Sequence, residues 1–157
     1  MVHNHDEIRS EDVIQANKIF YEKVAAQYED GHWYFKNRYE QSTWSKEVNK
    51  ICAQLSPGAK VLDIGAGTGN YTLKFMQWDV QITALDLSEN ILNILKERTK
   101  PVSHKIEFVL ADIETFLQEG ASTYDVVVAG SLLHHILDYV GLVEKLCHIV
   151  RPGGFLY

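Results

Sequence analysis

Short apolar runs recur after residue 57 and alternate with stretches of helical periodicity. The runs lie at 61–64, 80–85, 106–111 and 124–129, and a further run begins at the last residues of the chain. A parallel strand that helices cover on both faces is expected to be a nearly continuous apolar run of this kind. The alternation predicts an α/β fold, with a Rossmann-like doubly wound sheet of mostly parallel strands.

Helical patterns fill the chain before the first strand. From 10 to about 30, with Ser10 as the expected N-cap, apolar and aromatic residues gather on one helical face. A second helical stretch runs from about 38 to 55 and is closed by a Ser-Pro-Gly sequence. We therefore expect residues 1–56 to form a helical cap and residues 57–157 to form the α/β core.

The first strand breaks into three alternate glycines, Gly65, Gly67 and Gly69. Glycines allow a tight turn and let a ligand approach the main chain, and the helix expected after them would present its free N–H groups. The dinucleotide fingerprint G-x-G-x-x-G is broken here, because Asn70 stands where that pattern needs its third glycine. Asp63, at the end of the strand, disfavours a pyrophosphate and favours a cationic ligand.

Carboxylates follow the second and third strands. Asp86 ends the second strand roughly 20 residues beyond the first glycine, where nucleoside-binding sheets place the acceptor for ribose hydroxyls. Asp112 follows the third strand, and Ser88 is expected to cap a helix that runs to Arg98. Because ligands of open α/β sheets bind beyond the carboxyl ends of the strands, we expect these side chains to converge on one crevice.

The glycine loop and the later motifs together resemble the class I S-adenosylmethionine-dependent methyltransferases that act on small molecules. The resemblance rests on the acidic-apolar-G-x-G-x-G sequence at 63–69, on Asp86, on the acidic-apolar pair 112–113 and on the Arg-Pro-Gly-Gly turn at 151–154. It covers about 60–157. S-adenosylmethionine carries an ammonium and a sulfonium and no phosphate, so the resemblance agrees with the charge of the loop.

The resemblance implies a set of residues that bind S-adenosylmethionine. These residues are Asp63, Gly65, Ala66, Gly67, Gly69, Asp86, Leu87, Asp112, Ile113, Gly130, Tyr21 and Tyr28. It assigns the ribose to Asp86, the adenine to Leu87 and the 112–113 pair, and the methionine end to the glycine loop. Tyr21 or Tyr28, in a segment like the family's lid, would touch the methionine end, unless these aromatic rings only hold the helices against the sheet.

Methyl transfer needs little from a catalytic side chain, because the sulfonium is already an activated leaving group and the protein mainly aligns the reactants. A general base would help with some acceptors, and histidine has a suitable pKa. His134 and His135, just after the fourth strand, are the catalytic candidates, and the favoured alternative is that they only open the next helix and hold the loop. We assign no metal, since His3, His5 and Asp6 lie in a terminal segment that seldom forms such a site.

Composition narrows the function further. A net charge of −6 and scattered basic residues disfavour a nucleic-acid substrate, and no apolar run is long enough to span a bilayer. The polar, acidic N-terminal sequence resembles neither a secretory signal nor a transit peptide, so a cytoplasmic location is expected. Cys52 and Cys147 both fall on apolar faces of expected helices, where we expect buried free thiols.

The fifth strand has only just begun at Tyr157. Members of the resembling family continue into further strands, so we expect a fragment of a longer protein, or a strand edge through which the chain self-associates. The expected function is methyl transfer from S-adenosylmethionine to a small molecule. The alternatives are a non-catalytic or partner-completed module that binds this cofactor and, less favoured because of Asn70 and Asp63, an oxidoreductase domain that binds NAD.

Overall fold

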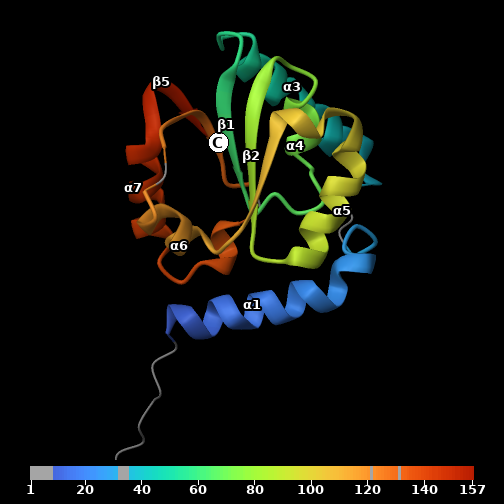
Figure 1. Cartoon of the computed structure of the whole chain (residues 1–157), viewed down its shortest axis with the longest axis vertical. Coiled ribbons are helices and arrows are strands. Elements are labelled where there is room, and N and C mark those ends of the chain that lie inside the picture. Colours follow the sequence, from blue (N-terminus) through green and yellow to red (C-terminus); the bar gives the residue numbers. More distant parts are fainter. Residues whose placement is uncertain (1–8, 32–35, 121, 131) are drawn as a thin grey trace, which may run out of the picture.

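A computed structural model describes residues 9–31, 36–120, 122–130 and 132–157. A five-stranded sheet lies at its centre, with the strands in the order β3-β2-β1-β4-β5 (Figure 1). The strands are β1 Ala59–Ile64, β2 Val80–Asp86, β3 Ile106–Leu110, β4 Tyr124–Val128 and β5 Val150–Leu156. All four neighbouring pairs are parallel. The predicted fold class is confirmed, and the chain order reverses between β1 and β4, which is the topological switch point of the sheet.

Helices cover both faces of this sheet (Figure 1). They are α3 Arg38–Cys52, α4 Thr72–Phe75 and α5 Glu89–Thr99 on one face, and α6 Ile113–Gln118 and α7 Tyr139–Ile149 on the other, while α1 Ser10–Val24 lies outside these layers. Short 3-10 turns are η1 Ala25–Gln27, η2 Lys100–Lys105 and η3 Leu133–His135. Buried residues of α3, α4 and α5 form one core with Val61 of β1, and residues of α6 and α7 form a second core with Leu62. Successive β1 side chains therefore point into different cores.

Helix α5 forms for the reasons that its sequence suggests. Ser88 is its N-cap, and the Ser88 hydroxyl accepts a hydrogen bond of 3.3 Å from the Ile91 N–H. Three apolar side chains on one face, Ile91, Leu92 and Leu95, are buried against the sheet. The helix ends at Thr99, one residue beyond the predicted end.

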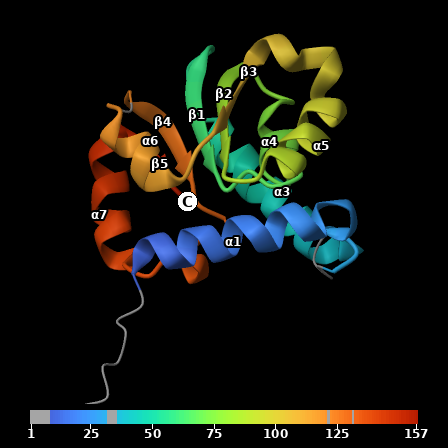
Figure 2. The same cartoon turned by 60° about the horizontal axis from the view of Figure 1, so that its bottom comes forward.

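Helix α1 differs from its prediction at both ends. Its N-cap is Arg9 instead of Ser10, and its regular part ends at Val24, where the turn η1 replaces the expected continuation toward residue 30. None of its residues is buried. Figure 2 shows α1 lying apart from the two helical layers, across one end of the sheet. Its apolar face therefore does not contribute to a filled core.

Two further predictions need correction. The Arg-Pro-Gly-Gly sequence does not precede the fifth strand but forms a bulge inside β5, because the partner of Tyr124 is Val150 and the partner of Val126 is Phe155. Gly153 has a positive φ of 80°, which suits a bulge. Cys52 is buried as expected, but Cys147 is exposed. The buried face of α7 is formed by Leu142 and Leu146, and Cys147 is rotated away from it.

Across the described ranges, no helix is long and apolar enough to cross a membrane.

Candidate functional site

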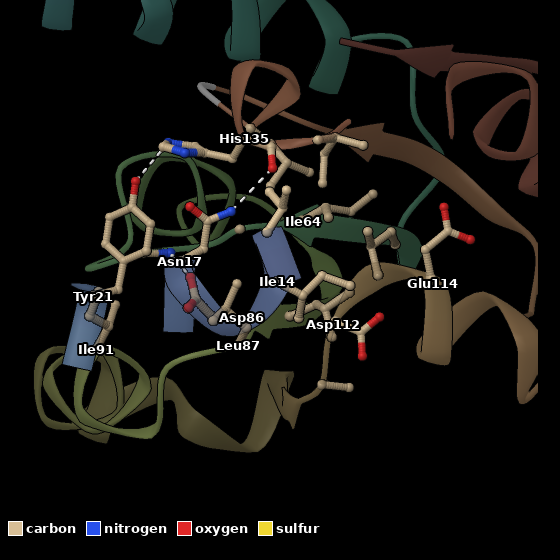
Figure 3. A pocket seen from close by; sticks show the side chains of 18 of the residues that line it. Ile14, Asn17, Tyr21, Ile64, Asp86, Leu87, Ile91, Asp112, Glu114 and His135 are labelled. Atoms are coloured by element: carbon tan, nitrogen blue, oxygen red, sulfur yellow. Dashed lines mark hydrogen bonds between the residues drawn. The ribbon is translucent and has the colours of Figure 1, made fainter. Parts of the chain in front are cut away.

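A cavity lies at the carboxyl ends of the strands, on the side that α1 covers. Its wall comes from the loop after β1, the tips of β2 and β3, the loop after β4, and α1 itself. Figure 3 shows side chains from these separate elements turned toward one another. The cavity therefore lies at the switch point, where a doubly wound sheet places its ligand.

The glycine loop forms one wall of the cavity with its main chain. Gly65 and Gly67 both line the cavity and have positive φ angles of 65° and 57°. A Cβ added at Gly67 would lie 3.7 Å from the ring of Tyr28, and one added at Gly65 would lie 3.2 Å from Leu132. Glycine therefore both permits the turn and leaves the main chain open to a ligand.

Asp86 joins the glycine loop to the tip of β2. One carboxylate oxygen accepts a hydrogen bond of 2.9 Å from the Gly67 N–H, and the other accepts one of 2.9 Å from the Ser88 N–H. The side chain lines the cavity although the residue is only 9% exposed. Burial raises the pKa of Asp86, and the N–H donors oppose this effect. A carboxylate has about four acceptor positions, more than these backbone N–H groups use, so the side chain can still accept from a ligand hydroxyl.

The tip of β3 supplies the next part of the wall. Asp112 and Ile113 both line the cavity, as does Leu87 after β2. The Asp112 carboxylate also caps α6, because it accepts hydrogen bonds of 3.0 Å from the Thr115 N–H and 2.6 Å from the Thr115 hydroxyl. Ile113 and Leu87 thus give this end of the cavity two apolar side chains beside one carboxylate.

The structure does not bring Asp63 into the wall, contrary to its predicted place. Asp63 is 1% exposed, and one of its oxygens accepts hydrogen bonds from the Thr72 N–H at 2.9 Å and the Thr72 hydroxyl at 2.6 Å. Burial raises the pKa of Asp63 to about 6. Its side chain points into the same core as Val61, because the two residues alternate with Leu62 along β1.

Two other residues that were predicted to bind the cofactor also lie outside the cavity wall. Ala66 and Gly69 do not line the cavity, and a Cβ at Gly69 would meet Leu95 of α5 at 2.5 Å. The helix after the loop, α4, is only four residues long, and its first N–H is held by Asp63 instead of facing a ligand. The expected helix N-terminus is therefore not part of this site.

Helix α1 closes the cavity through polar contacts with the segment after β4. The Tyr21 hydroxyl lies 2.6 Å from Nε2 of His135, and the Asn17 side chain donates a hydrogen bond of 3.1 Å to the His135 carbonyl oxygen (Figure 3). Tyr21, Tyr28, Gly130 and His135 all line the cavity. We call residues 10–29, which run from α1 to Glu29, the lid.

The two histidine candidates separate clearly. His135 lies in the wall of the cavity, whereas His134 is exposed and does not line it. The terminal residues His3, His5 and Asp6, to which no metal is assigned, fall outside the described residues. The described residues hold no group of three or more His, Cys, Asp or Glu side chains that could bind a metal ion.

Sequence reasoning missed part of the wall. Val13, Ile14 and Asn17 of α1 line the cavity, and so do residues 136–138. The apolar face of α1 was visible as a periodic pattern, but periodicity alone does not distinguish a face that packs on the core from one that covers a cavity.

The fold and the cavity agree with a comparison of the sequence with protein families. Residues 61–154 match the model of a family described as a methyltransferase domain, and the chain belongs to this family. Among curated proteins it is similar to the ubiquinone biosynthesis O-methyltransferase of Vibrio parahaemolyticus, with 29% identity over 100 residues, which are 64% of this chain and 43% of that protein. The chain spans less than half the length of the curated relatives that it matches.

Solved structures show the same fold. The magnesium protoporphyrin IX methyltransferase of Synechocystis PCC 6803, solved with bound S-adenosylmethionine, superposes with a TM-score of 0.72 at 18% identity over 89% of this chain and 73% of that chain. The phosphoethanolamine N-methyltransferase 1 of Haemonchus contortus, solved with phosphoethanolamine and S-adenosylhomocysteine, gives a TM-score of 0.70 at 18% identity over 99% of this chain and 34% of that chain.

Proposed function

We propose that this chain binds S-adenosylmethionine and belongs to an enzyme that transfers its methyl group to a small molecule. The observation that carries the proposal is the convergence of the glycine-loop main chain, Asp86 and Asp112 on one cavity at the switch point. In its described part, the cavity wall contains no lysine or arginine. Such a wall suits a cationic, phosphate-free ligand better than the pyrophosphate of NAD.

The residues of the wall suit the parts of this cofactor. The Asp86 carboxylate faces the cavity and keeps acceptor capacity for the ribose hydroxyls beyond its bonds to the main chain. Leu87 and Ile113 offer apolar surface for the adenine ring, and Asp112 lies beside them to accept from the amino group. Gly65, Gly67 and Gly130, with Tyr21 and Tyr28 of the lid, remain for the methionine end.

When bound, S-adenosylmethionine supplies a methyl group on a sulfonium, which an acceptor displaces in line. The lid covers the cavity and is held by the Tyr21 and Asn17 contacts with His135. We assign His135 to the acceptor end of the cavity, where Nε2 takes the acceptor's proton through the Tyr21 hydroxyl, 2.6 Å away, if the acceptor must lose one. His134 has no such position.

The proposed function extends to the domain organisation, the class of acceptor, self-association and location. Residues 1–56 act as a helical cap and residues 57–157 as the cofactor-binding core of a longer enzyme. Its acceptor is a small molecule rather than a nucleic acid, in keeping with the net charge of −6. If no further strand pairs with β5, its edge, where Leu156 and Tyr157 are 38% and 39% exposed, is instead the surface through which the chain would self-associate. We place the enzyme in the cytoplasm.

Transfer of labelled methyl groups tests the enzymatic part of the proposal. This chain and a version extended past Tyr157 are incubated with methyl-labelled S-adenosylmethionine and a metabolite extract, and labelled products are separated. Label in a small molecule supports the methyltransferase. If both proteins bind the cofactor and neither transfers label, a non-catalytic or partner-completed module is the better description.

Separate replacement of the two neighbouring histidines tests the proposed role of His135. On the acceptor found in that experiment, His135→Ala is expected to lower kcat by about 100-fold, a common effect of losing a general base. His134→Ala should leave kcat unchanged, because His134 is exposed and lies outside the cavity wall. Equal rates for both variants would remove His135 from the proposed chemistry.

A further inference from the structure

A compact cluster of hydrogen bonds joins the lid to the glycine loop and to α5. Arg98 pairs with both carboxylate oxygens of Glu29, through Nη1 to Oε1 and through Nη2 to Oε2 at 2.9 Å. The Thr68 hydroxyl donates to Oε1 of Glu29 at 2.7 Å, and Arg98 Nη1 also donates to the Thr68 carbonyl oxygen at 3.2 Å. We call Glu29, Thr68 and Arg98 the clasp.

The clasp is less exposed to solvent than an ordinary surface ion pair. The side chains of Glu29 and Arg98 are only 33% and 36% exposed, and Thr68 is 2% exposed. A two-pronged guanidinium–carboxylate pair fixes orientation as well as distance. The hydrogen bond from Arg98 holds the pKa of Glu29 below its ordinary value, so the pair stays charged at neutral pH.

The clasp lies directly behind two groups of the cavity wall. Tyr28 precedes Glu29, and its ring is the nearest neighbour of the Cβ position of Gly67, at 3.7 Å. Thr68 follows Gly67, whose N–H is held by Asp86. Fixing Glu29 to Thr68 therefore fixes the Tyr28 ring against the glycine loop.

A second contact ties the same end of the lid to α5. The Glu22 carboxylate accepts a hydrogen bond of 2.7 Å from the Glu89 N–H, and the Glu22 carbonyl accepts one of 3.3 Å from the Asn90 side chain. The lid is thus attached at both ends of α5. By contrast, residues 9–16 make no hydrogen bond or ion pair to the core within the described chain, and Asn17 is the first residue of the lid that does.

We propose that Glu29 and Arg98 are positioning residues of the cofactor site: their ion pair docks the Tyr28 end of the lid on the glycine loop, and the lid opens at its Ser10 end. The inference rests on the proposed function, since it concerns how the S-adenosylmethionine site is closed. Neither side chain lines the cavity. Both act through Tyr28 and Thr68.

Binding of S-adenosylhomocysteine, followed by calorimetry and by stopped-flow dissociation, tests the proposal. Glu29→Gln and Arg98→Gln should each raise Kd about tenfold, mainly through faster dissociation. The double variant should be no weaker than either single variant, because both changes break one interaction. Thr68→Val, which removes one donor to Glu29 at nearly constant volume, should weaken binding by a smaller factor.

Salt and a matched control separate positioning from general stability. The Kd of the unchanged protein should rise more steeply with salt than that of Glu29→Gln, since only the former keeps the ion pair. Lys100→Gln breaks a comparable pair with Glu97 beside the same helix, where both side chains are 67% exposed, and should leave Kd unchanged. Unfolding midpoints of all variants show whether the effect is confined to binding.

The outcomes distinguish this inference from the proposed function. If the unchanged protein binds S-adenosylhomocysteine while the Glu29 and Arg98 variants bind equally well with the same salt dependence, the clasp has no positioning role. The inference would also be overturned if Lys100→Gln lost as much affinity as the Glu29 and Arg98 variants, or if the loss of affinity in every variant only followed its loss of stability. If the unchanged protein does not bind, the proposed function itself fails.

Discussion

At the scale of single residues, two buried carboxylates that follow the same pattern serve different ends. Asp63 and Asp86 both lie at strand tips, but Asp86 faces the cavity and Asp63 faces the core behind the glycine loop. The sequence analysis predicted that both carboxylates contact the ligand. Asp86 could be predicted because its distance from the first glycine matches nucleoside-binding sheets, whereas the orientation of Asp63 depends on the pleat of β1, which the sequence does not show.

Replacing Asp86 is expected to weaken cofactor binding strongly. Asp86→Ala removes the acceptor for the ribose hydroxyls and for the Gly67 and Ser88 N–H groups, so Kd for S-adenosylhomocysteine should rise about 100-fold or more. The control is Asp79→Ala, at the opposite end of β2, where the carboxylate is 71% exposed and pairs with Lys105. Calorimetric titration of both variants checks this. Unchanged affinity in Asp86→Ala would contradict the ribose role.

Asp63 predicts a pH dependence of stability. Its pKa is raised from about 3.8 to about 6 in the folded protein, so folding favours the protonated form. The corresponding stability is fully present below the unfolded pKa and is lost as the pH rises through about 6, a loss of roughly 1 to 3 kcal/mol. Asp63→Asn cannot ionise, and its carbonyl oxygen can still accept from Thr72.

Urea unfolding of both proteins between about pH 4 and pH 7 measures this difference. The free energy of unfolding of the unchanged protein should fall relative to that of Asp63→Asn as the pH rises. Other buried carboxylates titrate in both proteins, so only the difference is informative. A difference that stays constant over this range would show that Asp63 ionises as freely in the folded state as in the unfolded state.

At the scale of elements, the sheet and α5 were predictable and the lid was not. The first four strands lie within one or two residues of their apolar runs, because burial on both faces leaves a strong signal, whereas β5 begins several residues earlier than predicted. Ser88 and its apolar face identified α5 for similar reasons. The position of the lid depends on contacts of its Tyr21, Glu22 and Glu29 with three residues that are more than 65 positions away in sequence, namely His135, Glu89 and Arg98. Local sequence patterns do not predict contacts between residues that are so far apart in the chain.

The lid predicts a change in ligand release. Tyr21→Phe keeps the ring but removes the hydroxyl that lies 2.6 Å from His135. Loss of one hydrogen bond of about 1 kcal/mol should speed the dissociation of S-adenosylhomocysteine about fivefold. Tyr39→Phe makes the same chemical change at a tyrosine of α3 that is 77% exposed. Stopped-flow dissociation compares them, and equal rates in the two variants would show that the Tyr21 contact does not hold the lid.

At the scale of the whole molecule, the chain order of the sheet explains why the site lies where it does. The connections from β1 run first toward β3 and then back past β1 to β4 and β5, so the tips of β1 and β4 diverge around a crevice. The glycine loop follows β1, Asp86 and Asp112 follow the next two strands, and α1 covers them all. Residues scattered over the sequence thereby form one wall.

The most direct test of the proposed function is a calorimetric titration of this chain with S-adenosylmethionine, S-adenosylhomocysteine and NAD under identical conditions. We predict that both adenosyl ligands bind at one site and that NAD does not bind, because the wall combines carboxylates with an open glycine-loop main chain. Binding of NAD alone, or of none of the three, would contradict the proposed cofactor and with it the proposed function.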